Sequence, residues 1–116
     1  MYGLHRRFRS TDEHPRGNPL DEELIEADVE AKCIDLALRA GYETRKLQWV
    51  GRRSAPDRVF FGLGRFVLVE FKVRGVRLKG LQRREFRRLR RAHKDVWAVW
   101  EVETFRAIMN IPEHIQ

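Results

Sequence analysis

The sequence predicts one α/β domain in which helices flank a central mixed sheet. Hydrophobic residues recur at three- and four-residue spacing in two long segments, and short β-rich runs lie between and after these segments. The runs are apolar on both faces, as in a sheet that helices cover on both sides. The length of 116 residues leaves room for one domain. We place it at residues 18–116, after a basic N-terminal tail, residues 1–17, that shows no apolar period.

The first helix is expected over residues 20–40. Asn18 followed by Pro19 fits an N-cap and a first helical position, and acidic residues fill the first turn. Gly41 fits the position directly after a helix end. Cys33, the single cysteine, lies on the apolar stripe of this helix and cannot form a disulfide within the chain. We therefore interpret it as a small core residue.

Three strands are expected next. Residues 46–50 are a candidate short strand, and a loop rich in glycine, arginine and serine follows it. Residues 57–62 and 65–72 are β-rich runs separated only by Leu63 and Gly64. This spacing indicates a tight antiparallel hairpin.

The rest of the chain adds a helix, a strand and a last helix. The long helix is expected over residues 81–92, and a nearly continuous apolar strand over residues 96–102. Thr104 is a candidate cap of a short last helix that ends near residue 110. Trp97 and Trp100 lie in the expected strand, where burial beside the long helix is favoured over stacking on nucleic-acid bases.

The charge balance favours a polyanionic partner. Lys and Arg number 24 against 17 Asp and Glu, a formal net charge of +7, which makes nucleic acid the first candidate. No apolar run approaches the roughly 18 residues of a membrane span, and the first residues contain no apolar signal core. We therefore expect an intracellular, cytoplasmic protein, with neither a membrane nor a small-molecule cofactor as partner. Basic residues are dense between positions 79 and 94, and phosphate contacts are expected from Lys79, Arg83, Arg84, Arg87, Arg88 and Arg91.

The expected hairpin brings three charged side chains together. Asp57 faces Glu70 across the strands, and Lys72 lies on the same face because side chains alternate along a strand. Two like charges directly opposite each other are unfavourable unless a cation lies between them. Hard oxygen ligands at this spacing suit Mg²⁺ or Mn²⁺. The alternative is a solvated hairpin end, with Glu70 paired to Lys72 or to an arginine.

The ordered set Pro56-Asp57 and Glu70-Phe71-Lys72 resembles the signature of the PD-(D/E)XK nuclease superfamily. A longer pattern, over residues 26–104, resembles the VRR-NUC family (virus-type replication-repair nuclease). Ser54 departs from this pattern, because glycine is expected at its loop position. The matching positions are residues 51–61, residues 64–72, Leu78, Gln82, residues 96–99, and Glu30 on the first helix.

The resemblance implies an αβββαβ nuclease core and metal-dependent cleavage of DNA phosphodiester bonds. Asp57 and Glu70 then become metal ligands, together with the backbone carbonyl of Phe71. Lys72 positions the attacking water or stabilises developing negative charge.

The resemblance also implies roles for Glu30 and Gln82. Glu30 would help to shape the metal site, although Glu26 lies on nearly the same helix face and both could be solvent-facing carboxylates. Gln82 would orient Lys72 or touch a phosphate, and a simple exposed glutamine is the alternative. Four arginines flank the expected metal site and could hold DNA strands near it: Arg52, Arg53, Arg58 and Arg74.

We therefore expect a Mg²⁺- or Mn²⁺-dependent, structure-selective DNA endonuclease, since nothing in the chain resembles a reader of base sequence. The resemblance suggests branched DNA of repair, such as a Holliday junction or a flap. A non-catalytic basic nucleic-acid-binding module on the same fold is the alternative. A homodimer is expected, because symmetric resolution of a four-way junction needs two cuts. The apolar C-terminal side chains are expected either to form the subunit contact or to dock on their own sheet: Phe105, Ile108, Met109, Ile111 and Ile115.

Overall fold

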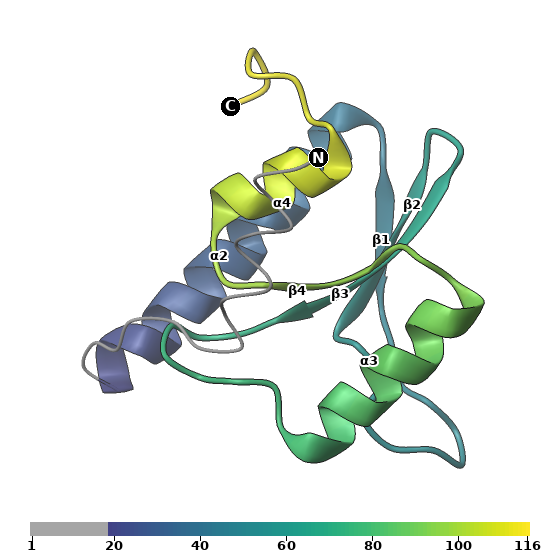
Figure 1. Cartoon of the computed structure of the whole chain (residues 1–116). Helices are drawn as coiled ribbons and strands as arrows, with labels where there is room; N and C mark the ends of the chain where they lie inside the picture. The colour runs from purple at the N-terminus through teal and green to yellow at the C-terminus, as the bar shows by residue number, and fades with distance from the viewer. Residues whose placement is uncertain (1–18) are drawn as a thin grey trace.

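The computed structural model describes residues 19–116, with side chains from Ala27 onward (Figure 1). Within this range the elements follow one another in the expected order of helix, three strands, helix, strand and helix. They are α2 (Pro19–Ala40), β1 (Glu43–Lys46), β2 (Arg58–Gly62), β3 (Arg65–Phe71), α3 (Gly80–Ala92), β4 (Val96–Val99) and α4 (Val102–Met109).

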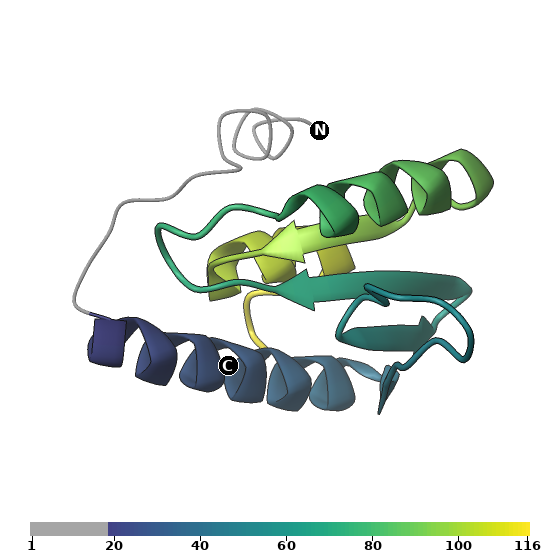
Figure 2. The ribbon, with the colours of Figure 1, turned by 90° about the horizontal axis from the view of Figure 1, so that it is seen from below.

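The four strands form one mixed sheet in the order β1-β2-β3-β4. β1, β2 and β3 pair antiparallel, and β4 joins β3 in parallel. Helices α2 and α4 pack against one face of the sheet and α3 against the other, so the sheet is the middle layer (Figure 2). The predicted sheet, covered by helices on both sides, is confirmed.

Leu63 and Gly64 form the tight turn between β2 and β3. Their φ angles are +51° and +77°, and a type I′ hairpin turn requires positive φ at both central positions. Gly62 and Arg65 close the hairpin as the first paired residues. The predicted two-residue turn is confirmed.

The hairpin register is also the expected one. The ladder runs to Arg58 opposite Val69. Continued by one residue, this register places Asp57 opposite Glu70. The hairpin therefore brings both carboxylates to the same end of the sheet.

Two apolar clusters fill the spaces on either side of the sheet. On the α2 and α4 face, Phe60 and Phe105 meet edge to face with ring centroids 5.0 Å apart. Cys33 is fully buried in this cluster, as predicted, and burial raises the pKa of its thiol, which makes it an unreactive core residue. The cluster on the α3 face is formed by Val59, Leu68, Leu78, Phe86, Val96, Ala98 and Trp100.

The prediction of a strand over residues 46–50 was wrong in position. The strand β1 begins three residues earlier, at Glu43, and is an exposed, polar edge strand. Tyr42 is buried directly after α2, and its hydroxyl donates to the Met109 carbonyl over 2.9 Å, so pairing with β2 starts at once. Leu47, part of the apolar signal that misplaced the strand, packs against the cluster on the α3 face instead.

Two predictions near the C-terminus were also wrong. The strand β4 ends at Val99 rather than at residue 102, because the Trp100 indole turns back and its Nε1 donates to the Val76 carbonyl over 3.0 Å. Thr104 does not cap the last helix. It is buried within α4, and Glu101 holds the N-cap position. The predicted burial is confirmed for Trp100, whereas Trp97 is only partly buried and packs against the cluster on the α2 and α4 face.

The C-terminal apolar side chains belong to the core. Phe105, Ile108, Met109 and Ile111 are buried there, and Ile115 packs against the same cluster. Docking on their own sheet is therefore confirmed, and these side chains are not available for a subunit contact. The predictions for the N-terminal tail and for the cap at residue 18 lie outside the described residues. No helix of residues 19–116 is long and apolar enough to span a bilayer.

Candidate active site

The Asp57 carboxylate ends the ladder between β2 and β3. Its Oδ2 accepts a hydrogen bond from the backbone N–H of Phe71 over 2.7 Å. If the ladder continued in the same register, this N–H would instead donate to the carbonyl of Pro56. The Asp57 carbonyl accepts the N–H of Leu47 over 3.0 Å, which ties it to the chain leaving β1. Asp57 is thus held from both neighbouring segments, and its Oδ1 has no hydrogen-bond partner in the described part of the chain.

Glu70 is buried near the end of β3, with only 7% of its surface exposed. It lies on the α3 face, where its oxygen Oε2 accepts a hydrogen bond from Gln82 Nε2 over 3.1 Å. Burying a carboxylate on an apolar sheet face is costly unless it is hydrogen-bonded or binds a cation. This placement therefore indicates a role beyond packing.

Gln82 also contacts Lys72. Gln82 Oε1 accepts a long hydrogen bond from Lys72 Nζ, over 3.4 Å, and a shorter one from the Lys79 backbone N–H, over 2.9 Å. The Lys79 contact holds the side chain in the first turn of α3. The amide group thus connects Glu70 to Lys72, and the hairpin register places Asp57 at the same end of the sheet.

The pKa of Asp57 is raised, mainly because burial disfavours its charged form and also because Glu30 is nearby. The Phe71 N–H, Lys72 and Lys46 oppose this shift without cancelling it. The protein surroundings of Asp57 therefore leave its charged form incompletely stabilised, and a bound cation would stabilise that form.

Glu30 reaches this region from α2. Its Oε2 accepts a hydrogen bond from Arg58 Nε over 2.9 Å, and Arg58 also donates to the Thr44 hydroxyl over 3.3 Å. The Arg58 side chain is only 16% exposed, so it lies inside the fold rather than on an open DNA-facing surface. No three His, Cys, Asp or Glu side chains of the described residues form a metal-binding group. The role of Glu30 in a metal site therefore stays a prediction, and the side chain of Glu26 lies outside the described part.

The donor set fits a hard divalent cation whose shell a substrate and water complete. Asp57, Glu70 and the backbone carbonyl of Phe71 offer oxygen donors at one end of the sheet. Mg²⁺ commonly binds one or two carboxylates and fills its other positions with water and substrate phosphate. The raised pKa of Asp57 agrees with such a site, because a cation would stabilise the buried carboxylate in its charged form.

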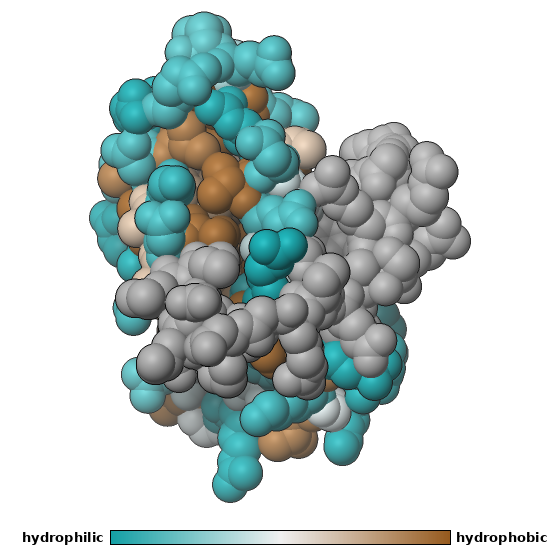
Figure 3. All heavy atoms as spheres, turned by 90° about the vertical axis from the view of Figure 1, so that its left-hand side faces the viewer, coloured by the Kyte–Doolittle hydropathy of each residue, from teal (hydrophilic) through white to brown (hydrophobic). Residues whose placement is uncertain are grey.

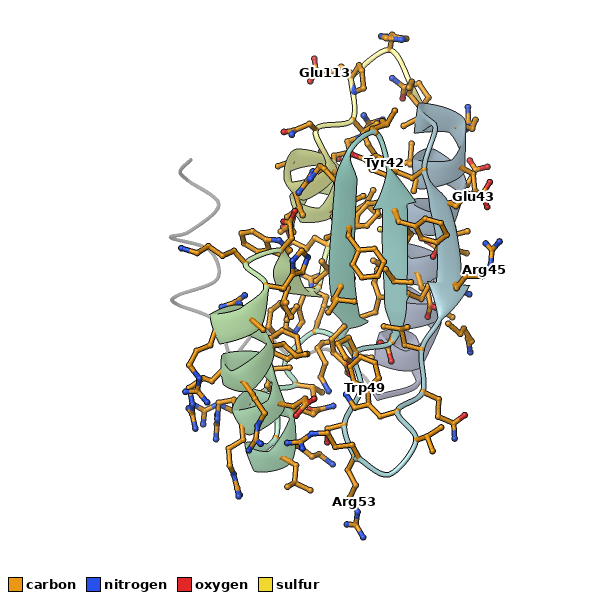
Figure 4. The ribbon with its side chains drawn as sticks, turned by 90° about the vertical axis from the view of Figure 1, so that its right-hand side faces the viewer. Tyr42, Glu43, Arg45, Trp49, Arg53 and Glu113 are labelled. Carbon is orange, nitrogen blue, oxygen red and sulfur yellow. The ribbon has the colours of Figure 1, made fainter. Side chains whose placement is uncertain are left out.

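The loop that precedes Asp57 is anchored to α3 by Glu85, a residue that the sequence pattern did not single out. The buried Glu85 carboxylate accepts hydrogen bonds from Trp49 Nε1 over 2.8 Å and from Arg52 Nε over 3.2 Å. Figure 4 shows Trp49 in this loop beside α3, and Arg53 at the loop tip pointing away from the body of the protein. The available signal was that Glu85 is the only acid within a strongly basic helix.

The basic residues expected to contact DNA fall into two groups. Arg52 and Arg58 form ion pairs with Glu85 and Glu30. In Figure 4, nitrogen-tipped side chains extend from α3 away from the sheet, so this helix presents a cationic surface. The other expected contacts are exposed or partly exposed: Arg53, Arg74, Lys79, Arg83, Arg84, Arg87, Arg88 and Arg91.

Ser54 adopts the conformation that glycine would take at this loop position. Its φ is +65°, in the left-handed region that residues with a side chain enter at a cost. The departure from the expected glycine therefore leaves the left-handed backbone geometry in place.

Of the comparisons with known proteins, the one with solved structures agrees with this fold. No family model and no curated protein sequence matches the chain. A solved structure described as a VRR_NUC domain superposes with a TM-score of 0.67 at 25% sequence identity. The match covers 74% of this chain and 95% of that chain, so nearly the whole of the compared domain has a counterpart here.

Proposed function

Because this chain belongs to the VRR-NUC family of nuclease domains, we propose that it is a Mg²⁺- or Mn²⁺-dependent endonuclease that hydrolyses phosphodiester bonds in DNA. The proposed substrates are branched DNAs of repair, such as Holliday junctions or flaps. The observation that carries the proposal is that Gln82 links Glu70 and Lys72 by hydrogen bonds, next to Asp57. A non-catalytic DNA-binding module on this fold would need the arginines but not this buried polar cluster.

Each residue of the cluster has a chemical task in this proposal. Asp57 and Glu70 would hold the divalent cation, which when bound polarises a phosphoryl oxygen and lowers the pKa of a coordinated water. Lys72 would place its ammonium against the phosphate, whose transition state carries extra negative charge. Gln82 keeps Lys72 beside Glu70, so it acts as a positioning residue.

Selectivity for DNA structure over sequence follows from the distribution of charge. The exposed arginines of α3 would bind backbone phosphates, which carry no direct sequence information. A branched DNA presents phosphates from more than one helical arm. The cationic helix would therefore favour it through shape.

We propose a homodimer as the cutting unit, because a two-fold pair supplies two opposed cuts by symmetry. The contact would involve surface other than the buried C-terminal side chains. Figure 3 shows hydrophobic residues gathered on the side where α2 and α4 lie, and Leu38 of α2 is 48% exposed. Light scattering at micromolar protein concentration, with and without junction DNA, tests the oligomeric state. A monomer in both conditions that still cuts the junction contradicts the dimer.

The proposed activity is tested with labelled branched and linear DNA, incubated with the protein and Mg²⁺, Mn²⁺, Ca²⁺ or EDTA. Cleavage of branched DNA is expected with Mg²⁺ or Mn²⁺ and none with EDTA. Calcium should support binding without cutting, because its looser coordination shell places the water poorly. Cleavage that persists in EDTA contradicts the metal-dependent mechanism.

Three variants separate chemistry from binding. Asp57→Asn, Glu70→Gln and Lys72→Ala should each abolish cleavage while DNA binding is largely retained, because the lost interactions act on the transition state. Asp35→Asn is the matched control, since Asp35 is an exposed carboxylate of α2 that pairs with Arg39 on the surface. Cleavage at the wild-type rate in any of the three variants would remove that residue from the proposed mechanism. DNA binding with no cleavage under any metal would favour the non-catalytic alternative.

A further inference from the structure

A pocket of about 190 Å³ lies between α3 and β4, and the proposed metal site does not use it. Pockets for whole drug-sized ligands have roughly 300–1,000 Å³. This one is therefore sized for a single small ring system rather than for a large ligand. Its lining consists of Leu78, Arg83, Phe86, Arg87, Arg90, Ala98 and Trp100.

The floor of the pocket is apolar and firmly held. Leu78, Phe86, Ala98 and Trp100 all belong to the buried cluster on the α3 face. Trp100 is fixed by the hydrogen bond from its Nε1 to the Val76 carbonyl. A planar apolar group can therefore enter against a preformed surface.

The rim carries guanidinium groups. Arg90 donates two hydrogen bonds to the Val96 carbonyl, over 2.9 and 2.7 Å, and lies 5.7 Å from the Phe86 ring and 5.6 Å from the Trp97 ring. Arg87 is exposed and has no hydrogen bond or ion pair with any other described residue. Guanidinium planes stack on nucleobases and bind phosphates in a bidentate manner. The rim thus combines a fixed cation with one that can move onto a ligand.

Ala98 also offers a backbone donor and acceptor at the open edge of the sheet. The Asp95 carbonyl, just before β4, accepts a hydrogen bond from Leu68, and the Val99 carbonyl accepts one from Lys72, just after β3. The backbone groups of the odd-numbered residues of β4 therefore face β3. The N–H and C=O of Ala98 therefore face away from β3, at the edge where no further strand lies among the described residues. Such unpaired edge groups can bind the polar edge of a base.

The pocket and the candidate metal site lie close together. Ala98 is the parallel partner of Glu70, and neighbouring strands are about 4.8 Å apart. Gln82 and Arg83 are consecutive residues of α3, and the first contacts Glu70 while the second lines the pocket. A DNA strand with one base in the pocket would therefore carry its backbone past the cluster of carboxylates.

We propose that this pocket takes one unpaired base of the DNA substrate, with the rim arginines on the adjoining phosphates. The proposal rests on the proposed nuclease function and adds how the site would recognise a branch, where stacking is interrupted and bases are unpaired. A simple anion would gain nothing from the apolar floor, and a purely apolar ligand would gain nothing from the guanidinium rim. A base joined to a phosphate uses both.

The test compares two duplexes that are identical except at one extra, unpaired nucleotide, which carries a base in one duplex and is abasic in the other. Binding to the full chain is measured by fluorescence anisotropy in EDTA, so that the proposed cleavage does not interfere. The wild-type protein should bind the duplex with the base about five- to a hundred-fold more tightly, as expected for one stacked base. A separate titration with deoxyadenosine monophosphate alone tests whether the pocket binds a free nucleotide.

Two variants and a matched control locate the effect. Arg87→Ala removes an exposed rim cation, and Ala98→Val adds volume to the floor in a residue type that strands accommodate. Each should bring the affinity ratio of the two duplexes toward one. Arg88→Ala removes the same charge from the same helix outside the pocket lining, so it should lower both affinities and keep the ratio.

The possible failures are distinguishable. A wild-type ratio of one, in a protein that binds and cuts branched DNA, would overturn the pocket and leave the nuclease proposal standing. Equal loss of the ratio in Arg87→Ala and Arg88→Ala would also overturn the pocket. If the mononucleotide binds and the protein shows no preference between the duplexes, the pocket is a site for a free nucleotide, and the proposal of a DNA-base pocket is overturned. No binding to any DNA would overturn the nuclease function, and the pocket proposal with it.

Discussion

Gln82 donates from Nε2 to Glu70 Oε2 over 3.1 Å, and this hydrogen bond joins the first turn of α3 to the end of β3. The other end of the same amide accepts a hydrogen bond from Lys72. An amide can hold a carboxylate and an ammonium together in this way because it carries a donor and an acceptor. Neither an acid nor a base of similar size could do both.

Replacement of Gln82 should therefore impair catalysis more than binding. Gln82→Ala should lower kcat by about 10- to 100-fold, in line with outer residues of metal sites, with little change in KM. Gln82→Glu should lower kcat further and should shift the pH profile of the reaction. A third carboxylate at the site must either take up a proton or repel the Glu70 carboxylate. Steady-state kinetics across pH check both. Gln48→Ala, at an exposed loop glutamine, is the control, and a Gln82→Ala rate equal to that of Gln48→Ala contradicts the positioning role.

The α3 arginines should supply affinity rather than chemistry. Replacing Arg84, Arg87 and Arg91 by Ala should weaken binding to all DNA sequences alike and reduce the log–log salt slope by about 0.9 for each lost phosphate contact. Binding titrations over a range of salt concentrations measure the slope. Arg39→Ala removes a charge from α2, on the opposite side of the sheet, and should leave the slope unchanged. An unaltered slope in the triple variant would show that α3 does not face the DNA.

Asp57 should destabilise the metal-free protein at neutral pH. Its folded pKa is raised above its unfolded value of about 3.9. A raised carboxyl pKa contributes stability below the unfolded pKa, and this contribution is lost as the pH rises through the folded value. At pH 7 in EDTA, Asp57→Asn should therefore have a higher Tm than the wild type, and the difference should shrink as the pH falls toward 4.

Magnesium should reverse the order of the two melting temperatures. It should raise the Tm of the wild type, because a cation that binds only the folded state stabilises it, and should leave Asp57→Asn nearly unchanged. Thermal denaturation with and without Mg²⁺ measures both effects. Asp28→Asn, at an exposed carboxylate paired with Lys32, should show neither. A lower Tm of Asp57→Asn than of the wild type in EDTA would contradict the raised pKa of Asp57.

Glu85 should stabilise the loop that precedes Asp57. Glu85→Ala removes the acceptor of two hydrogen bonds, from Trp49 and Arg52, and should lower the free energy of unfolding by about 1–3 kcal/mol. Denaturant unfolding gives this value. Glu43→Ala breaks an exposed ion pair with Arg45 and should cost at most about 1 kcal/mol. Equal losses in the two variants would mean that the loop does not depend on Glu85.

Local chemistry in the sequence was sufficient for the hairpin and for the face that its charged residues share. A two-residue turn with glycine restricts the pairing of its flanking strands, and the period of two along a strand then decides which side chains share a face. This arithmetic places Asp57, Glu70 and Lys72 on one face, whereas their proposed roles come from the resemblance to nuclease motifs. The order of the elements was predictable for a similar reason, since apolar periodicity is a local property.

The tertiary structure alone decided where the strand after α2 begins, what the C-terminal segment contacts and what holds the loop before Asp57. The strand β1 is polar and exposed, so its pairing comes from the edge of β2 and from the anchor of Tyr42, neither of which has a local signal. The C-terminal side chains are as apolar as an interface would need, and only the packing of α4 against α2 shows that they are core. Glu85 likewise gains its partners from residues more than 30 positions away. Contacts of this kind depend on which surfaces folding brings together, and no pattern within one segment encodes them.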